Sequence, residues 1–299
     1  MTTTFKQLAD EVMLSMYGYT AKQDRTTHLY ADINSSATTI NFDSVSNIGK
    51  GIIEIDEELI WLDTYDRISS NGYIPPYGRG FQGTTAAAHT AGTKVTIAPN
   101  FPRFNIKKAI NDTILATYPN LWGVATTTFT TTATRTTYPL PAEAETVLFV
   151  SWQLTGPSQE WRRVKSYRHD PLANTTSFGT GNSISIYDGI TPGRTVQVYY
   201  TKRPNTLVND NDVFETLTGY PNSCKDVIVY GTCYRLLSFI DPGRLNYASA
   251  EADLADSKTQ YGSAASSAKY IRSLYQERLT EEAGKLRDTY PNSIHYTRY

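Results

Sequence analysis

The feature that most constrains the fold is the order of helix-patterned and strand-patterned stretches along the 299 residues. Three stretches repeat apolar residues at helical spacing. The two stretches between them contain short β-type runs bounded by Gly, Pro, Asn and Ser. Because elements that close the core come from both ends of the chain, the order predicts an α+β protein. In it, β-domains are inserted between the helices of one helical body.

Four helices are expected in that body. Within residues 4–17, Leu8, Val12 and Met16 recur every four residues and define one buried side. A second helix over 102–118 begins near a proline, whose missing N–H is harmless there, and ends before the next proline.

The third helical stretch, residues 222–283, is divided by Asp241-Pro242-Gly243. A long C-terminal helix is expected from Leu245 to Ala283, with small and aromatic residues on its packing side. A helix of that length suits contact with neighbouring subunits as well as packing within one subunit.

The two β-type stretches are read as separate domains. Residues 26–98 contain the runs HLYADI, TTINFDSV, GIIEIDEELIWL and KVTIAP, which predict a small all-β module. Residues 124–203 contain six short β-type runs separated by turn residues, for which a β-sandwich is the natural packing. The expected divisions are 1–25 (N-terminal helix), 26–100 (inserted β-module), 101–123 (second helix), 124–205 (β-sandwich-like domain), 206–288 (C-terminal helices) and 289–299 (extended tail).

Composition narrows the class of protein. Charged residues make up 19% of the chain and the net charge is −1. The chain therefore lacks the excess of basic residues that is typical of a sequence-reading DNA binder. A surface rich in Thr and Tyr suits permanent protein contacts, but the same residues also favour strands. The two cysteines, Cys224 and Cys233, are expected to stay reduced in a protein assembled in the host cytoplasm. Neither a signal peptide nor a membrane-spanning run of about 18 apolar residues is recognised.

No constellation of catalytic or metal-binding residues stands out, so neither an enzyme nor a cofactor is predicted. The four histidines are far apart and lack metal-ligand spacing. The acidic run around Glu54, Asp56, Glu57 and Glu58 resembles a glycosidase pair only superficially. Its alternation with isoleucine favours a hairpin with solvated acids.

The stretch 51–98 carries a more specific pattern, GIIEIDEELIWLDTYD followed by PYGRGFQGTTAAAHTAGTKVTI. It resembles a small β-module that recurs in tailed-phage structural proteins. The matching positions are Glu58, Ile60, Trp61, Arg79, Gly80, Gly83, Thr84, Ala87, His89, Gly92, Thr93 and Val95. The turn Asp56-Glu57 departs from the pattern, which more often has Gly there. These are interpreted as fold residues, in which the glycines allow a tight loop and Arg79 and His89 fasten it by hydrogen bonds.

The whole architecture is similar to that of phage head-to-tail adaptors. The resemblance implies a non-enzymatic virion protein of the neck, forming a twelve-subunit ring between the portal and the tail or nozzle proteins. It also implies a channel with non-specific contacts to genomic DNA, and no membrane partner. The C-terminal extension would dock on the portal through an aromatic, basic segment. Its residues are Ile294, His295, Tyr296, Arg298 and Tyr299.

Two other classes remain open. One is another phage component, such as a tail, baseplate or fibre-attachment subunit. The other is a carbohydrate-binding or hydrolytic protein, in which Glu58 or Asp56 would be essential. Symmetry and portal binding separate the first from an adaptor, and bound sugar or turnover would reveal the second.

Overall fold

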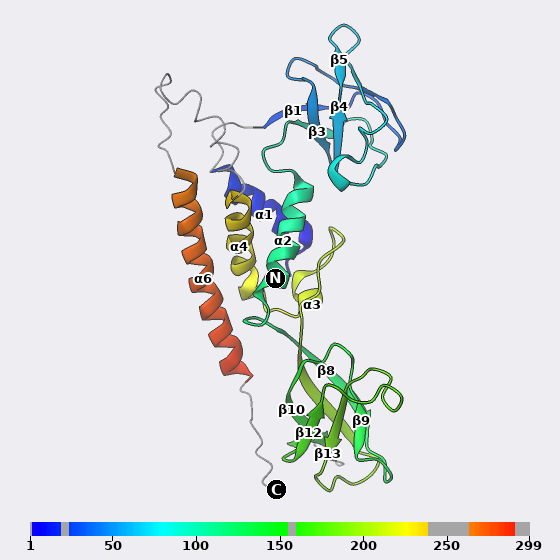
Figure 1. Ribbon diagram of the computed structural model, residues 1–299, viewed down its shortest axis with the longest axis vertical. Coiled ribbons are helices and arrows are strands. Elements are labelled where there is room, and N and C mark those ends of the chain that lie inside the picture. Colours follow the sequence, from blue (N-terminus) through cyan, green and yellow to red (C-terminus); the bar gives the residue numbers. More distant parts are fainter. Residues whose placement is uncertain (1, 19–23, 155–159, 239–262, 291–299) are drawn as a thin grey trace. The chain divides into compact units, whose positions relative to one another are not determined.

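The computed structural model describes residues 2–18, 24–154, 160–238 and 263–290 (Figure 1). The chain divides into two compact units. One comprises Met1–Phe5, Asp112–Ile228 and Ser273–Tyr299, and the other comprises Lys6–Asn111 and Val229–Arg272. Each unit therefore joins segments that are far apart in the sequence, and each contains one β-module.

The first β-module consists of two antiparallel sheets. Its strands are β1 (Arg25–His28), β2 (Thr39–Asn41), β3 (Gly51–Ile55), β4 (Glu58–Leu62), β5 (Thr64–Asp66), β6 (Asn71–Tyr73) and β7 (Lys94–Ile97), with a short 3-10 turn η1 (Phe81–Gly83). Four strands pair in the order β1-β7-β3-β4 and three in the order β2-β6-β5. Their shared core includes Ile40, Phe42, Ile53 and Ile60, all essentially inaccessible to solvent.

The second β-module repeats this plan with longer strands. Its strands are β8 (Gly123–Thr130), β9 (Thr137–Pro139), β10 (Thr146–Gln153), β11 (Trp161–Arg163), β12 (Tyr167–Asp170), β13 (Ser183–Ile186) and β14 (Thr195–Lys202). The orders are β11-β10-β14-β8 and β12-β13-β9. Valines of β10 and β14 are buried in its core together with Ile184 and Tyr138.

The helices follow the predicted positions with local differences. They are α1 (Phe5–Tyr17), α2 (Arg103–Thr117), α3 (Phe214–Thr218), a 3-10 turn η2 (Asn222–Cys224), α4 (Lys225–Ser238) and α6 (Ser263–Thr289). The predicted stripe Leu8, Val12 and Met16 on α1 is confirmed, because each side chain is fully buried. Helix α2 ends just before Tyr118-Pro119, as expected.

The C-terminal helix differs from the prediction at its end. Helix α6 continues to Thr289, beyond the expected end at Ala283, and the residues between 239 and 262 lie outside the described ranges. The five residues of α3 were not predicted at all, because they form barely more than one turn and carry no helical repeat. Gly219, with a φ of 74°, ends α3 in the left-handed conformation typical of a helix C-terminus.

The predicted fold class was wrong in its balance. A body of four helices with a small β-insert and one further β-domain was expected. The structure has helix and strand in nearly equal shares, 30% and 28%, with four antiparallel sheets and, in the described part of the chain, five helices. The physical reason is that a sheet with one apolar face must bury it against another layer. Each β-type stretch solves this internally with a second, three-stranded sheet, so both modules are complete sandwiches.

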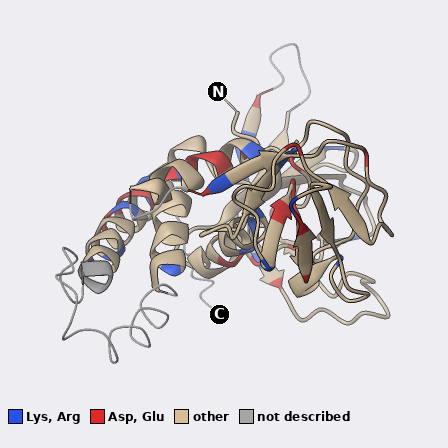
Figure 2. Cartoon of the chain, turned by 90° about the horizontal axis from the view of Figure 1, so that it is seen from above, with Lys and Arg blue, Asp and Glu red and all other residues tan. Residues whose placement is uncertain are grey.

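Charged residues of both signs are scattered along the chain among uncharged ones (Figure 2). Within the described ranges, none of the helices combines the length and the hydropathy that a membrane crossing requires.

Candidate functional site

The hairpin between β3 and β4 positions the most unusual cluster of charged residues in the structure. The strands pair from Gly51↔Leu62 to Ile55↔Glu58, which leaves Asp56 and Glu57 as the two-residue turn. Asp56 has a φ of 54°, a left-handed conformation that Asp tolerates better than most residues. The turn therefore forms even though Asp stands where the similar phage modules more often have Gly.

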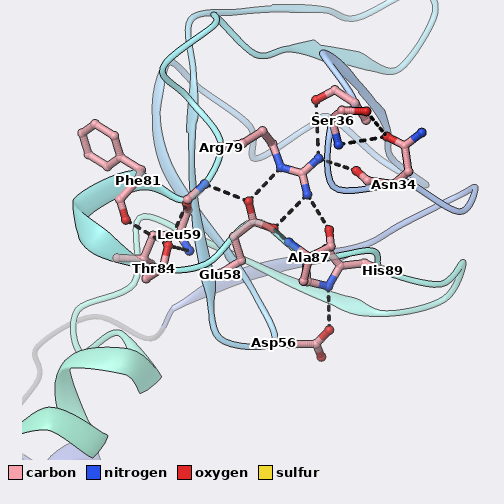
Figure 3. Close-up of polar contacts among 12 residues, drawn as sticks. Asn34, Ser36, Asp56, Glu58, Leu59, Arg79, Phe81, Thr84, Ala87 and His89 are labelled. Carbon is pink, nitrogen blue, oxygen red and sulfur yellow. Dashed lines mark hydrogen bonds and ion pairs between the residues drawn. The ribbon is translucent and has the colours of Figure 1, made fainter.

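Glu58, the first residue of β4, is a buried carboxylate with only 2% of its surface exposed. The Arg79 guanidinium donates to both carboxylate oxygens, from Nε to Oε1 at 2.7 Å and from Nη2 to Oε2 at 2.8 Å (Figure 3). The backbone N–H groups of Gly80 and Ala87 donate to the same two oxygens at 2.9 and 3.0 Å. Burial alone would raise the pKa of Glu58, but the donors around it hold that pKa well below its usual range.

His89 lies between two carboxylates. Its Nε2 is 3.0 Å from Oε2 of Glu58 and its Nδ1 is 2.8 Å from Oδ2 of Asp56. The hydrogen bond with Glu58 raises the pKa of His89; burial opposes this, and Asp56 adds to the increase. In its charged form the imidazolium donates from both nitrogens, so the ring ties the hairpin turn to the loop that precedes β7.

Arg79 extends the cluster into the neighbouring loops. Its Nη1 donates to the carbonyl of Asn34 at 2.6 Å, and its Nη2 also donates to the carbonyl of Ala87 at 2.6 Å. The hydroxyl of Thr84 accepts from the N–H of Leu59 and donates to the carbonyl of Phe81. Three loops are thus attached to the start of β4 through side chains rather than through strand pairing.

The remaining motif residues shape these loops. The rings of Trp61 and Phe81 lie 5.5 Å apart. Gly80 has a φ of 59°, and a Cβ there would lie 2.8 Å from the carbonyl oxygen of Thr84. Gly83 and Gly92 also have positive φ, and the Gly92 N–H donates to the carbonyl of Leu29 at 2.7 Å.

The prediction that the acids of this hairpin are solvated was wrong for two of them. Glu58 is buried as described, and Glu54 is only 7% exposed. Strand alternation correctly predicts that Glu54 lies on the other face of the sheet from Ile53 and Ile55. That face is covered as well, so Glu54 is not solvated. Its cover is the first turn of α2, where the Arg103 N–H donates to the Glu54 carboxylate.

Further charged contacts fasten the hairpin to α2. Lys107 pairs with Glu57, and Arg103 reaches Asp10 of α1 at 2.6 Å. Burial raises the pKa of Glu54 to about 7, although the Arg103 N–H and guanidinium favour its charged form. No periodic pattern in the sequence predicts these contacts, because the residues that make them come from three separate segments of the chain.

The chemistry of the Glu58 cluster indicates a structural role, in which it holds loops of the first module together. Both carboxylate oxygens are already bonded to protein donors, and the depressed pKa of Glu58 is opposite to that of a general acid. In the part of the chain that the structure describes, no group of His, Cys, Asp and Glu is arranged to hold a metal ion. Within those same residues, His169 instead contacts the side chain of Asn182, with 2.7 Å between Nε2 and Oδ1.

The predicted docking segment, with Ile294, His295, Tyr296, Arg298 and Tyr299, lies outside the described residues. The last described residue is Tyr290, whose ring makes an edge contact with Trp122 at 6.1 Å between centroids.

A surface cluster on the second module was missed by the sequence reading. Phe149 of β10 stacks on Tyr199 of β14 with centroids 4.2 Å apart, and the Arg163 guanidinium lies 4.5 Å above the Phe149 ring. These residues occupy the sheet face opposite the core. The pairings Phe149↔Tyr199 and Ser151↔Arg163, which bring them together, depend on register that alternation alone does not fix.

Comparison with protein families supplies the decisive observation. The family model described as SU10 adaptor protein matches residues 84–282, about two thirds of the chain. The chain belongs to the SU10 adaptor protein family. The match spans α2, the second β-module, α3, α4 and most of α6, whereas strands β1–β6 precede it. The family match of this SU10 adaptor-family chain therefore covers mainly the residues after the first β-module. The motif that resembles other phage modules lies mostly before the match, within residues 51–98.

Membership identifies the chain as an adaptor-type structural protein of a phage, with a place in the virion. A structural family agrees with a non-enzymatic role. Comparison with curated proteins finds no match.

Proposed function

We propose that this SU10 adaptor-family protein forms a twelve-subunit ring between the portal and the tail or nozzle proteins, leaving a channel through which DNA passes. The observation that carries the proposal is the family match over residues 84–282. A ring of identical subunits uses one heterologous contact repeated around an axis, so each subunit needs two different complementary surfaces.

The surface of the chain suits permanent contacts. Only 19% of residues are charged, and apolar side chains protrude at turns. Ile68, in the turn between β5 and β6, is 97% exposed, and Leu172, which follows β12, is 91% exposed. Side chains held out on ordered turns are suited to fill pockets of a partner protein.

The C-terminal segment is assigned in this proposal to the portal. Ile294, Tyr296 and Tyr299 would supply apolar contacts, and His295 and Arg298 would add polar ones. Aromatic residues are enriched at protein interfaces because they bury a large area with little loss of conformational entropy.

The proposal is tested by mixing the protein with purified portal rings and weighing the complex by native mass spectrometry. Twelve copies per portal ring are expected. A chain truncated after Tyr290 should retain its circular dichroism spectrum and lose portal binding. Retained binding by the truncated chain would refute the docking segment alone, whereas failure of the full chain to bind portal would refute the adaptor position and favour a tail or baseplate component.

A further inference from the structure

A connection of five residues, 98–102, joins the last strand of the first β-module to helix α2. Ala98 still bonds to the sheet, because its N–H donates to the carbonyl of Ile52 at 2.9 Å. The carbonyl of Pro102 already accepts a helical bond, from the N–H of Ile106 at 3.0 Å. Only residues 99–101 lie between these two bonds, and Pro99 lacks the N–H that a longer strand would need.

This connection has the features of a pivot. Ala98 has a φ of 49°, a left-handed conformation that is unfavourable for a residue with a Cβ. The backbone N–H and the side-chain Nδ2 of Asn100 both donate to Oδ1 of Asp24, at 3.1 and 2.7 Å. Because Asp24 immediately precedes β1, the two ends of the module are tied together at one point. A few residues at such a point can absorb the change in backbone angles when a domain turns.

Charged residues hold the β3–β4 hairpin of the module against helices α1 and α2. Lys107 of α2 pairs with Glu57 in the hairpin turn. The Arg103 guanidinium lies 2.6 Å from Asp10 of α1 and 4.0 Å from Glu57, and the Arg103 N–H donates to the carboxylate of Glu54. All five residues belong to the same compact unit. These contacts therefore fix the module on the helices at a place other than the pivot.

Glu54 is the buried acid among these contacts, with 7% of its surface exposed. Burial raises its pKa to about 7, although Arg103 of α2 and Lys94 of β7 favour the charged form; Asp24 favours the neutral form. Tyr17 of α1 also faces it: burial raises the pKa of Tyr17, and the charges of Asp24 and Glu54 add to the increase. An ionised Glu54 is thus the member of the group that gains most from exposure to water.

The direction of the pH effect follows from the two states of Glu54. A glutamate exposed to water has a pKa of about 4.3. With the hairpin held on α2, Glu54 keeps its proton up to about pH 7. Proton binding therefore favours the contact: its contribution is complete below about pH 4.3 and is lost as pH rises to about 7.

We propose that the first β-module is a movable arm that pivots at residues 98–102, and that protonation of Glu54 locks it onto α1 and α2. Below neutral pH the contacts of Glu54, Glu57, Arg103 and Lys107 hold the arm. Above neutral pH the locked form exchanges with a released form in which the module stays folded. The family match agrees with an appended arm, because strands β1–β6 precede it and α2 lies within it.

The test measures a distance between the arm and α1. Spin labels are attached to Leu14→Cys on α1 and Ile68→Cys on the module, at positions that are 73% and 97% exposed. Cys224 and Cys233 are buried and should remain unlabelled. An excess of unlabelled chain ensures that double electron–electron resonance reports distances within one subunit. A single narrow distance is expected at pH 5 and a broader distribution at pH 8, with the ratio of locked to released form falling on the order of 50-fold.

Two substitutions on the same hairpin separate the causes. Glu54→Gln keeps an acceptor for the Arg103 N–H and cannot ionise, so the distance should stay narrow at both pH values. Glu57→Gln removes the partner of Lys107, so the released form should increase at both pH values while the response to pH remains.

The same distance distribution at pH 5 and pH 8 in the otherwise unaltered chain would overturn the proposal. An unchanged response to pH in Glu54→Gln would also overturn it, because another group such as His28 or His89 would then be responsible. Circular dichroism should be equal at both pH values, and a loss at pH 8 would contradict the release of a folded module. None of these measurements involves portal, so their outcome is independent of the proposed ring position.

Discussion

The two β-modules have the same plan and different sources of stability. Each pairs a four-stranded with a three-stranded antiparallel sheet. In the first, no strand exceeds five residues, and the loops are held by the buried Glu58–Arg79–His89 cluster. In the second, three strands have eight residues, and its ion pairs, such as Arg162–Glu160 and Arg203–Glu145, lie at the surface. The first module, with short strands and long loops, thus depends for its stability on buried ion pairs. The second module, with long strands, depends on its apolar core.

The largest loss of stability is expected when the Glu58–Arg79–His89 cluster of the first module is disrupted. Glu58→Gln removes the negative charge and replaces one of the two carboxylate oxygens by an NH2 group that cannot accept a hydrogen bond. The donors bonded to that oxygen lose this partner; for Oε2 these are Arg79 Nη2, the Ala87 N–H and His89 Nε2. Breaking one side of a buried ion pair typically lowers the free energy of unfolding by about 3–5 kcal/mol. Limited proteolysis read by mass spectrometry should show cleavage in the first module while the second stays protected.

Glu160→Gln is the matched control, because this carboxylate forms an exposed pair with Arg162. It should leave the cleavage pattern of both modules unchanged. Equal loss of protection in both modules on Glu58→Gln would contradict the separation of the two.

A destabilisation of similar size, confined to the second module, is expected from a substitution in its apolar core. Ile184 is fully buried, so Ile184→Ala leaves a cavity and should lower the free energy of unfolding by about 2–5 kcal/mol. Urea titration followed by hydrogen exchange should place the loss in the second module. The loss should be the same at pH 5 and pH 8, because no titrating group is removed.

The stability of the first module should depend on pH in both directions. The pKa of His89 is raised, so its stabilisation is complete below the unfolded value of about 6.5 and is lost as pH rises through the folded pKa. Glu54, with a pKa of about 7, acts in the same direction, since the folded state keeps a proton that the unfolded chain releases above about pH 4.3.

Glu58 acts oppositely. Its pKa is lowered, so its stabilisation is present above about pH 4.3 and is lost as pH falls toward the folded pKa. The first module should therefore be most stable at mildly acidic pH and the second should vary less. Hydrogen exchange by module across pH 4 to 8 would show this, and Glu54→Gln should flatten the decline between pH 5 and 7. A first module that gains stability steadily from pH 5 to 8 would contradict the assignment.

The smallest change in stability is expected from an exposed ion pair of the first module, which tests whether burial decides what an ion pair contributes. Lys50 and Asp63 form a 2.6 Å ion pair, but both side chains are exposed to solvent. Lys50→Gln should not change the midpoint of unfolding measurably, since solvent screens the pair. A loss close to that of Glu58→Gln would show that charge pairing as such, rather than its burial, stabilises the module.

Local patterns predicted the elements well. The i, i+4 repeat of Leu8, Val12 and Met16 fixed the buried side of α1, and Pro119 marked the end of α2. The motif residues from Glu58 to His89 were recognised from their spacing, although their mutual geometry could not be. Glu58 meets Arg79 and His89 across 21 and 31 residues of sequence, and only the folded loops bring them together.

Burial and pairing were the parts that the sequence could not provide. Glu54 reads as a solvated acid because alternation says which face it occupies, not what covers that face. The second sheet of each module consists of three- and four-residue strands, too short for a periodic signal. The place of β8 at the edge of its sheet is likewise a property of strand order, which depends on contacts between β8 and β14 about 70 residues apart.

The proposed ring is tested most directly by electron microscopy of the protein alone and mixed with purified portal. The account predicts a twelve-fold ring stacked on the portal along a common axis. A three-fold or six-fold particle that does not associate with portal would contradict it.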